Sequence, residues 1–312
     1  RPTAMFSILI PSWNNLPYLK LCIESIRRHS AFDHEIIVHV NEGSDGTLEW
    51  VRAEGIRHTW SRGNVGVCVA MNDAAQLATR DWVLFMNDDM YCLPGWDSAF
   101  GAAVEAIGED VPMYLAAHLI EPLDTGNEQV TVANYGTGPE GFDEQGLLSF
   151  AAGVKASDRS GIAVQPMLTQ RRLWHMVGGY SIEFGPGMSS DDDFLMKIWL
   201  AGCRTYRVVG ACHIYHFGCA TTRRVRRNKG GRTFILKWGI SQQEFVRSYV
   251  RRTATAERSS LPTVPRAGMA GRLKRAVYAL ARYPLGDLEN WEPDLPRQIV
   301  MNSSRSARVD LD

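Results

Sequence analysis

The stretch Phe6–Asn15 reads FSILIPSWNN, an apolar run of strand length followed by polar residues that favour a turn. Its apolar part, Phe6–Pro11, predicts a buried strand, and the following stretch Leu16–Arg28 carries apolar residues at helical spacing. The same order continues to about Tyr91, with strands predicted at Glu35–Val40, about Ile56–Trp60 and Trp82–Met86, and helices at Thr47–Ala53 and Gly66–Ala78. Strands that alternate with helices indicate βαβ units and a mostly parallel sheet, an α/β fold.

Beyond Tyr91 the pattern is less regular. Glu121–Gly161 is rich in Gly, Asn and Pro and gives no assignment. Helices are predicted at about Pro94–Ile107, Gln170–Val177, Asp191–Ala201, Thr233–Lys237, Ser241–Arg252 and Arg272–Arg282, and strands at Met113–Leu119, near Thr205–Val209 and near Cys212–His216.

The composition is that of a globular protein. The 312 residues are 45% hydrophobic and 22% charged, which excludes disordered, collagen-like and coiled-coil classes. The chain holds no apolar run near the roughly 20 residues that span a bilayer, and from the first residues we expect no signal sequence. Its six cysteines form no CxxC pair, which fits a reducing compartment. We therefore expect a cytoplasmic protein.

The overall charge of zero conceals two parts of opposite net charge. Residues 1–219 hold 15 Lys and Arg against 26 Asp and Glu, a net charge of −11, whereas residues 220–312 hold 19 against 8, a net charge of +11. A basic segment of this kind is either solvated surface or a contact for an anionic partner such as lipid headgroups, a lipid pyrophosphate or nucleic acid.

Polar side chains gather where the predicted strands end. PSWNN follows the first strand, NEGSDG (41–46) the second, and NDD (87–89) the fourth. In open parallel sheets ligands bind beyond the carboxyl ends of the strands, so these loops predict the functional edge. Two carboxylates beside a buried strand are costly unless a cation neutralises them, so Asp88 and Asp89 are candidates for Mg²⁺ or Mn²⁺, although such a pair also serves as a turn or cap.

Two later clusters are also candidates. Ser189–Asp193 reads SSDDD and precedes an apolar helical run; capping explains one or two of these side chains, and helical geometry lets only one or two carboxylates face a given cleft. One of them is a candidate base. In His213–His216 the strand alternation separates His213 from His216, and each is either a ligand or a hydrogen-bonded structural residue.

The order of these pieces resembles one family. FSILIPSWNN, EIIVHVNEGSDGT (35–47), NVGVCVAMN (64–72), WVLFMNDDM (82–90) and the segment from VGGY (177–180) to IYHFG (214–218) are similar to the family-2 inverting glycosyltransferases with the GT-A fold, of the bacterial polysaccharide or glycolipid type. The resemblance covers about three quarters of the chain, from Met5 to about Trp238. It implies a GT-A catalytic domain at 5–219, divided into a nucleotide-sugar-binding half (5–120) and an acceptor-binding half (121–219), with a basic helical extension at 220–312.

The resemblance also implies roles for single residues. Asp89 and His216 match the residues that hold Mn²⁺ or Mg²⁺ against the donor diphosphate, and Asn87 stands where the family has its first Asp. Asp191 matches the catalytic aspartate, with Ser190 in place of the usual Glu. The remaining donor-side candidates are Pro11, Asn41, Glu42 and Asp88, and Asp192 is an acceptor-side candidate that, like Asp193, takes the role of base if the register differs by one. Independently of the resemblance, Arg62 and Asn64 precede a helix start and are either donor-diphosphate contacts or a surface Arg and a loop Asn. Tyr180 is either an acceptor contact or core packing.

The predicted function is transfer of a sugar from a nucleotide-diphosphate donor to a hydroxyl of a glycan or lipid-linked acceptor, with one displacement that inverts the anomeric carbon. Two alternatives stand beside it: a nucleotidyltransferase that makes nucleotide sugars, and a non-catalytic sugar- or lipid-binding protein with a decayed site. No nucleic-acid partner is expected. The helix predicted at Arg272–Arg282 places Leu273, Val277 and Leu280 on one face among basic residues, which fits either an anionic membrane surface or packing against the domain.

Overall fold

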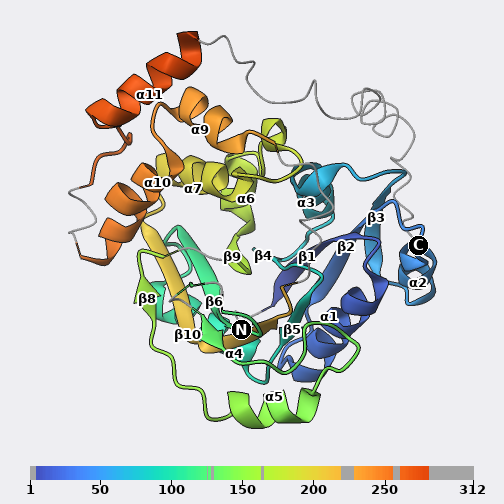
Figure 1. Cartoon of the computed structure of the whole chain (residues 1–312). Helices are drawn as coiled ribbons and strands as arrows, with labels where there is room; N and C mark the ends of the chain where they lie inside the picture. The colour runs from blue at the N-terminus through green and yellow to red at the C-terminus, as the bar shows by residue number, and fades with distance from the viewer. Residues whose placement is uncertain are drawn as a thin grey trace.

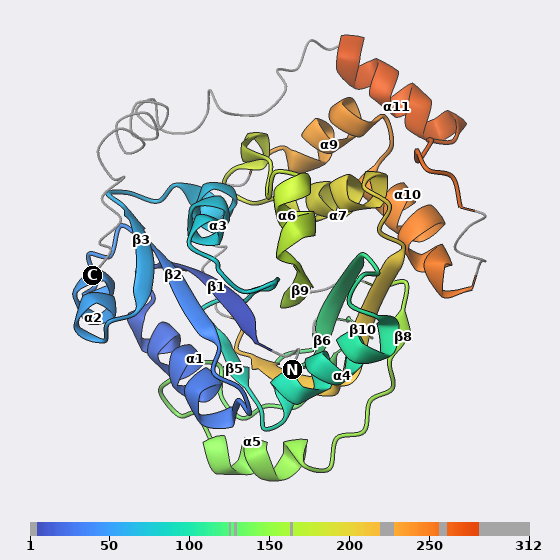
Figure 2. The ribbon, with the colours of Figure 1, turned by 180° about the vertical axis from the view of Figure 1, so that it is seen from behind.

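The computed structural model describes residues 5–124, 126–127, 130–162, 165–218, 228–255 and 261–280. Within these residues one ten-stranded sheet lies between layers of helices (Figure 1; Figure 2). The strands are β1 (Phe6–Trp13), β2 (Glu35–Asn41), β3 (Arg57–Ser61), β4 (Trp82–Phe85), β5 (Met90–Cys92), β6 (Met113–Glu121), β7 (Thr131–Val132), β8 (Arg159–Ser160), β9 (Met167–Gln170) and β10 (Thr205–His216).

The helices lie on both faces of this sheet. They are α1 (Leu16–His29), α2 (Thr47–Ala53), α3 (Gly66–Gln76), α4 (Trp96–Ile107), α5 (Glu144–Ala151), α6 (Arg171–Met176), the 3₁₀-helix η1 (Ile182–Phe184), α7 (Ser190–Leu200), α9 (Gly230–Trp238), α10 (Gln242–Phe245), the π-helix η2 (Val246–Val250), the 3₁₀-helix η3 (Arg251–Ala254) and α11 (Met269–Leu280). None of the helices in the described ranges is long and apolar enough to cross a membrane.

The sheet order is β3-β2-β1-β4-β9-β6-β10-β5. Strands β1 to β4 run parallel to one another, β6 runs parallel to β10, and β9 is antiparallel to both of its neighbours, β4 and β6. The predicted α/β fold with a mostly parallel sheet is confirmed. The carboxyl ends of β1, β2, β4, β6 and β10 therefore lie along one edge.

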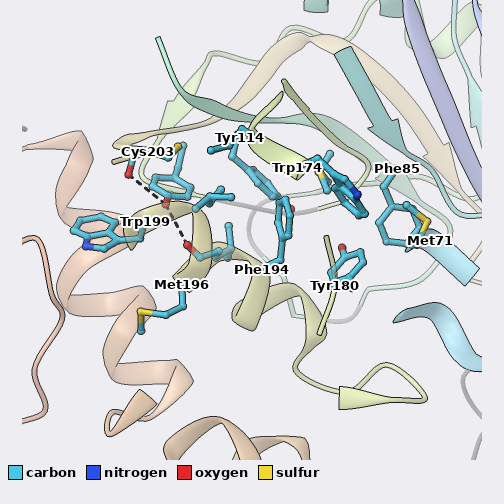
Figure 3. Packing of buried hydrophobic residues seen from close by; sticks show 14 of the residues in the cluster. Met71, Phe85, Tyr114, Trp174, Tyr180, Phe194, Met196, Trp199 and Cys203 are labelled. Carbon is cyan, nitrogen blue, oxygen red and sulfur yellow. Dashed lines mark hydrogen bonds between the residues drawn. The ribbon is translucent and has the colours of Figure 1, made fainter. Parts of the chain in front are cut away.

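Side-chain alternation along the strands divides the core into two layers. Ile8, Ile10 and Val38 face the layer of α1, α2 and α4, whereas their neighbours Leu9 and Ile37 face the layer of α3, α6 and α7. The second layer is rich in aromatic rings, and Figure 3 shows part of it. This packing fixes the start of α7 over the sheet.

The described part of the C-terminal extension shares this core. Phe234 on α9, Phe245 on α10 and Val250 on η2 are buried in the same cluster as Trp199 of α7. Trp199 packs edge-to-face on Phe245, with ring centroids 6.0 Å apart. The predicted boundary at residues 219 and 220, and residues 281–312 of the predicted extension, lie outside the described residues.

Two expectations for elements need correction, and the described part of the stretch without an assignment contains three short elements. Gln170 ends strand β9 instead of opening a helix, because Met167–Gln170 inserts between β4 and β6. The two strands predicted at Thr205–Val209 and Cys212–His216 are one strand, β10, with a register shift against β6 between Val209 and His213. The unassigned stretch 121–161 contains β7, α5 and β8.

Candidate active site

Asp88 joins the loops that follow β1 and β4. Ser12 Oγ donates to Asp88 Oδ2 at 2.7 Å, and Asn15 Nδ2 donates to Asp88 Oδ1 at 3.0 Å. All three side chains are buried. The structure thus shows Asp88 bracing the edge of the sheet, while a direct contact with a donor stays a prediction.

Asp89 lies beside His216, which is 127 residues further along the chain. His216 Nε2 is 3.5 Å from Asp89 Oδ2, and His216 Nδ1 is 2.8 Å from Glu121 Oε1. The strand pairing places His216 beside Asp89 and Glu121, because Ile120 pairs with Tyr215 on β10 and Phe217 N donates to Asp89 O at 3.0 Å. Two residues predicted separately are therefore brought together, with Glu121 as a third member.

This cluster stabilises positive charge. Burial alone lowers the pKa of His216, but hydrogen bonds and negative charge from Asp89 and Glu121 raise that pKa to about 10. A carboxylate on the far nitrogen of an imidazole is also the arrangement that orients a metal-ligating histidine.

The donor set suits a divalent cation that shares its ligands with a substrate. Asp89 and His216 would supply two ligand atoms, and no cluster of three or more His, Cys, Asp or Glu side chains in the described ranges is arranged to hold a metal ion. Mg²⁺ and Mn²⁺ sites of phosphate-binding enzymes take few protein ligands and complete their shell with water and phosphate oxygens. The residues present fit such an ion.

The end of β2 forms a second polar group. Asn41 is buried, and its Oδ1 accepts a hydrogen bond from Val65 N at 2.9 Å, which ties β2 to the start of α3. Glu42 follows with φ +66°, and its carboxylate accepts hydrogen bonds from Trp13 Nε1 and Ser44 Oγ, both at 2.9 Å. These bonds lower the pKa of Glu42. The Trp13 indole is therefore fixed in orientation at the edge of the sheet.

The remaining donor-side candidates lie along the same edge. Arg62 is exposed after β3, and Asn64 Oδ1 accepts a hydrogen bond from Gly66 N at 2.9 Å where α3 begins. Pro11 is half-buried near the end of β1, and Asn87 is half-buried after β4. Their contacts with a donor stay predictions.

Asp191 is held at the start of α7 by two side chains. Tyr180 OH and Gln165 Nε2 both donate to Asp191 Oδ1, each at 2.6 Å. Burial raises the pKa of Asp191 to about 6, Asp192 adds to this rise, and the two hydrogen bonds oppose it. A carboxylate with this pKa is ionised at neutral pH and is still basic enough to accept a proton.

The strand register places Asp191 at the same edge as Asp89. Phe85 of β4 pairs with Met167 of the antiparallel β9, so Gln165, two residues before Met167, leaves the sheet beside Asn87, two residues after Phe85. Gln165 reaches Asp191 from there. The loop before α7 also contacts the start of α3, where Val67 N donates to Pro186 O at 2.9 Å.

Tyr180 lies beneath Asp191. Its ring is 2% exposed and packs edge-to-face on Phe85, with centroids 6.0 Å apart, and Figure 3 shows it near Met71 and Phe85. Asn72 holds its backbone through two hydrogen bonds. The structure therefore shows Tyr180 positioning Asp191, and its predicted contact with an acceptor stays untested.

The two following carboxylates point to the C-terminal helices. Gln242 Nε2 donates to Asp192 Oδ2 at 2.5 Å. Asp193 is fully buried and accepts a hydrogen bond from Trp238 Nε1 at 2.7 Å, and Lys237 Nζ lies 2.9 Å from Asp193 Oδ1. Of the three carboxylates, Asp191 thus faces the edge of the sheet where Asn87 and Asp89 lie.

Two members of the site were missed from the sequence. Glu121 begins the stretch that gave no assignment, and Gln165 precedes a strand that was not predicted. Neither belongs to a motif. A correct placement of β9 beside β4 would have drawn attention to Gln165.

Comparison with known proteins identifies similar sequences and structures. Residues 7–154 match the model of Glycosyl transferase family 2. It is 28% identical over 185 residues to the "PGL/p-HBAD biosynthesis glycosyltransferase" of Mycobacterium tuberculosis, and equally to that of Mycobacterium bovis. The match covers 58% of this chain, and the chain spans 64% of the length of those relatives.

Solved structures share the fold. TarS 1–349 of S. aureus superposes with a TM-score of 0.53 at 15% identity, covering 95% of this chain and 78% of that one. TarS 1–349 in complex with UDP-GlcNAc gives a TM-score of 0.51 at 13% identity, covering 95% of this chain and 79% of that one. The fold is thus the GT-A glycosyltransferase fold.

Proposed function

We propose that this protein is an inverting glycosyltransferase that moves a sugar from a nucleotide-diphosphate donor to a hydroxyl of a glycan or lipid-linked acceptor, as in polysaccharide biosynthesis. The family and the named relatives support glycosyl transfer. Structures of TarS hold UDP and UDP-GlcNAc, which supports a nucleotide-sugar donor. A nucleotidyltransferase receives no support from these similarities.

One observation carries the mechanism: Asp191 is fixed beside the edge of the sheet where Asp89 and His216 meet. Tyr180 and Gln165 both donate to Oδ1, so among the described contacts Oδ2 is left to accept the proton of the acceptor hydroxyl. Loss of that proton lets the oxygen attack the anomeric carbon while the nucleotide departs on the opposite side. A single displacement inverts the configuration.

Asp89 and His216 would hold Mn²⁺ or Mg²⁺, with Glu121 orienting His216. When bound, such an ion stabilises negative charge that develops on the leaving diphosphate. The protein's own part is to hold Asp89 through the braced loops after β1 and β4 and to present Trp13 and Glu42 to the nucleotide end of the donor. Arg62 and the positive end of the α3 dipole provide positive charge for phosphate.

The test is Asp191→Asn, which keeps the shape of the side chain and removes the base. With UDP-GlcNAc and other nucleotide sugars in the presence of Mn²⁺, and water as the acceptor, we expect hydrolysis to fall by about 10²–10⁴-fold. Thermal stabilisation by UDP and Mn²⁺ should persist, and Asp110→Asn at an exposed site should behave as wild type. Equal rates in wild type and Asp191→Asn would contradict the assigned base, and binding of nucleotide without turnover of any donor would favour a non-catalytic binding protein.

A further inference from the structure

Helix α11 (Met269–Leu280) presents apolar side chains to solvent. Met269 is 88% exposed, Leu273 68%, Val277 54% and Leu280 82%. At about 100° per residue these four fall within an arc of about 80° on one face of the helix. Large apolar side chains gathered on one exposed face indicate a contact surface.

The opposite face of α11 is the one that contacts the protein. A Cβ at Gly271 would meet Glu244 and Ala267, and the guanidinium of Arg232 lies 5.4 Å from the Tyr278 ring. The apolar arc therefore points away from the rest of the described residues. In both Figure 1 and Figure 2, α11 lies beyond α9 at the end of the molecule opposite α5.

Cationic side chains border this arc on both sides. Arg272 and Lys274 each lie about 60° beyond an edge of the arc, and both are exposed. Long basic side chains in these positions can extend to a phosphate layer while the apolar residues between them enter the acyl region. This arrangement suits an anionic bilayer, whereas an apolar protein partner would leave the flanking charges without counterions.

A basic pocket opens beside the same helix. It has a volume of about 510 Å³ and lies between the end of α9 and α11, lined among others by Trp238, Gly239, Arg266, Arg272 and Arg275. Gly239 ends α9 with φ +76°, and a Cβ there would lie 3.4 Å from Arg275 Nη1. Guanidinium groups bind phosphate through paired N–H donors.

We propose that α11 docks this protein on an anionic phospholipid bilayer, with Met269, Leu273, Val277 and Leu280 inserted among the acyl chains and a lipid phosphate bound between Arg266, Arg272 and Arg275. The same end of the molecule carries α7 and the C-terminal helices that contact Asp192 and Asp193. A lipid-linked acceptor held in that bilayer would then lie on the acceptor side of the protein. The docking itself does not depend on glycosyl transfer.

The experiment is co-sedimentation of the full chain with vesicles. Wild type should bind vesicles of phosphatidylcholine with about 30% phosphatidylglycerol at least tenfold more tightly than pure phosphatidylcholine, and less tightly as salt rises. Leu273→Glu with Leu280→Glu should lower binding to the anionic vesicles at least tenfold. Met176→Glu on α6, a residue 69% exposed, is the matched control and should bind as wild type.

Arg272→Gln with Arg275→Gln separates the headgroup pocket from the apolar arc, because it should abolish the preference for phosphatidylglycerol and retain a weak, salt-independent binding. The proposal is overturned if wild type does not bind anionic vesicles or binds both lipid compositions equally. It is also overturned if Leu273→Glu with Leu280→Glu binds as wild type. It is also overturned if light scattering shows a dimer that becomes a monomer on Leu273→Glu, since a second copy would then cover the face. Thermal stabilisation by UDP, measured on the same variants, reports separately on the donor site.

Discussion

Tyr180 is the residue whose chemistry is most closely coupled to Asp191. Its hydroxyl donates to Asp191 Oδ1 and thereby favours the ionised carboxylate against the burial that raises its pKa to about 6. Tyr180→Phe removes this bond, so the pKa of Asp191 should rise further. Because a base must be ionised to work, the acid limb of the pH profile of kcat/KM should move from about pH 6 to higher pH by about one unit.

The matched control is Tyr249→Phe, which removes a hydroxyl bonded to the backbone of Arg266 and not to Asp191. It should leave the acid limb in place. A Tyr180→Phe enzyme with reduced kcat and an unchanged acid limb would show that Tyr180 acts only by packing on Phe85.

Glu121 acts through His216. Its carboxylate accepts from His216 Nδ1 and fixes the ring so that Nε2 faces Asp89. Glu121→Gln should weaken Mn²⁺ binding by about 10–100-fold, as loss of an orienting carboxylate does at other metal sites. Calorimetric titration with Mn²⁺ in the presence of UDP measures this, with exposed Glu140→Gln as the control, and unchanged affinity in Glu121→Gln would remove Glu121 from the site.

The residues of the site divide into those a sequence can reveal and those it cannot. Asp89, Asp191 and His216 stand in ordered motifs, so the resemblance to a family is enough to mark them. Glu121 and Gln165 enter the site only because β6 lies beside β10 and β9 lies beside β4. Such contacts depend on strand order, which hydrophobic periodicity does not encode.

Helix α9 is the element that secures α7. Lys237 on α9 lies 2.9 Å from Asp193 Oδ1 on α7 and 2.6 Å from Glu183 Oε1, and the Asp193 carboxylate is fully buried. Lys237→Met removes the nearer cation of that buried carboxylate and leaves Lys197, whose Nζ lies 3.9 Å from Asp193 Oδ2, so the free energy of unfolding should fall by about 2 kcal/mol. Urea unfolding measures the loss.

Two variants sharpen this prediction. Lys155→Met at an exposed site should change the free energy of unfolding by less than about 0.5 kcal/mol. Lys237→Met combined with Asp193→Asn should cost less than the sum of the single changes, because the buried charge is gone. A Lys237→Met protein as stable as wild type would show that α9 is held by its apolar contacts alone.

Among the elements, the long periodic segments were predictable and the short ones were not. The parallel strands and helices up to residue 91 were predicted close to their observed bounds, and Thr47–Ala53 coincides with α2. β9 is only four residues long, and its Gln170 reads equally well as the start of the following helix. Its position in the sheet is decided by tertiary pairing with β4 and β6.

At the scale of the whole molecule, the acidic part (1–219) and the basic part (220–312) of the sequence share one core in the described ranges. The basic extension contributes Phe234, Phe245 and Val250 to the core around Trp199. Its α9 and α10 contact the carboxylates of α7 on one side, and α11 is exposed on the other. The sequence revealed the change of charge but not the packing of these helices on the core, since apolar residues at helical spacing do not indicate which element they contact.

The raised pKa of Asp191 should also lower the free energy of unfolding of the whole chain at neutral pH. An unfolded Asp ionises near pH 3.8, whereas Asp191 in the folded protein holds its proton up to about pH 6. Between these values the unfolded state releases a proton that the folded state retains, so ionisation favours unfolding, and the penalty is complete above about pH 6. A shift of this size corresponds to at most about 3 kcal/mol of folding free energy, and partial exposure of the side chain reduces it to about 1–2 kcal/mol.

Asp191→Asn keeps an oxygen for Tyr180 and Gln165 but carries no charge, so it should stabilise the protein at pH 7.5 and leave its stability nearly unchanged at pH 4.5. Thermal unfolding at the two pH values measures the difference, with exposed Asp110→Asn as the control. If Asp191→Asn is no more stable than wild type at pH 7.5, folding does not raise the pKa of Asp191.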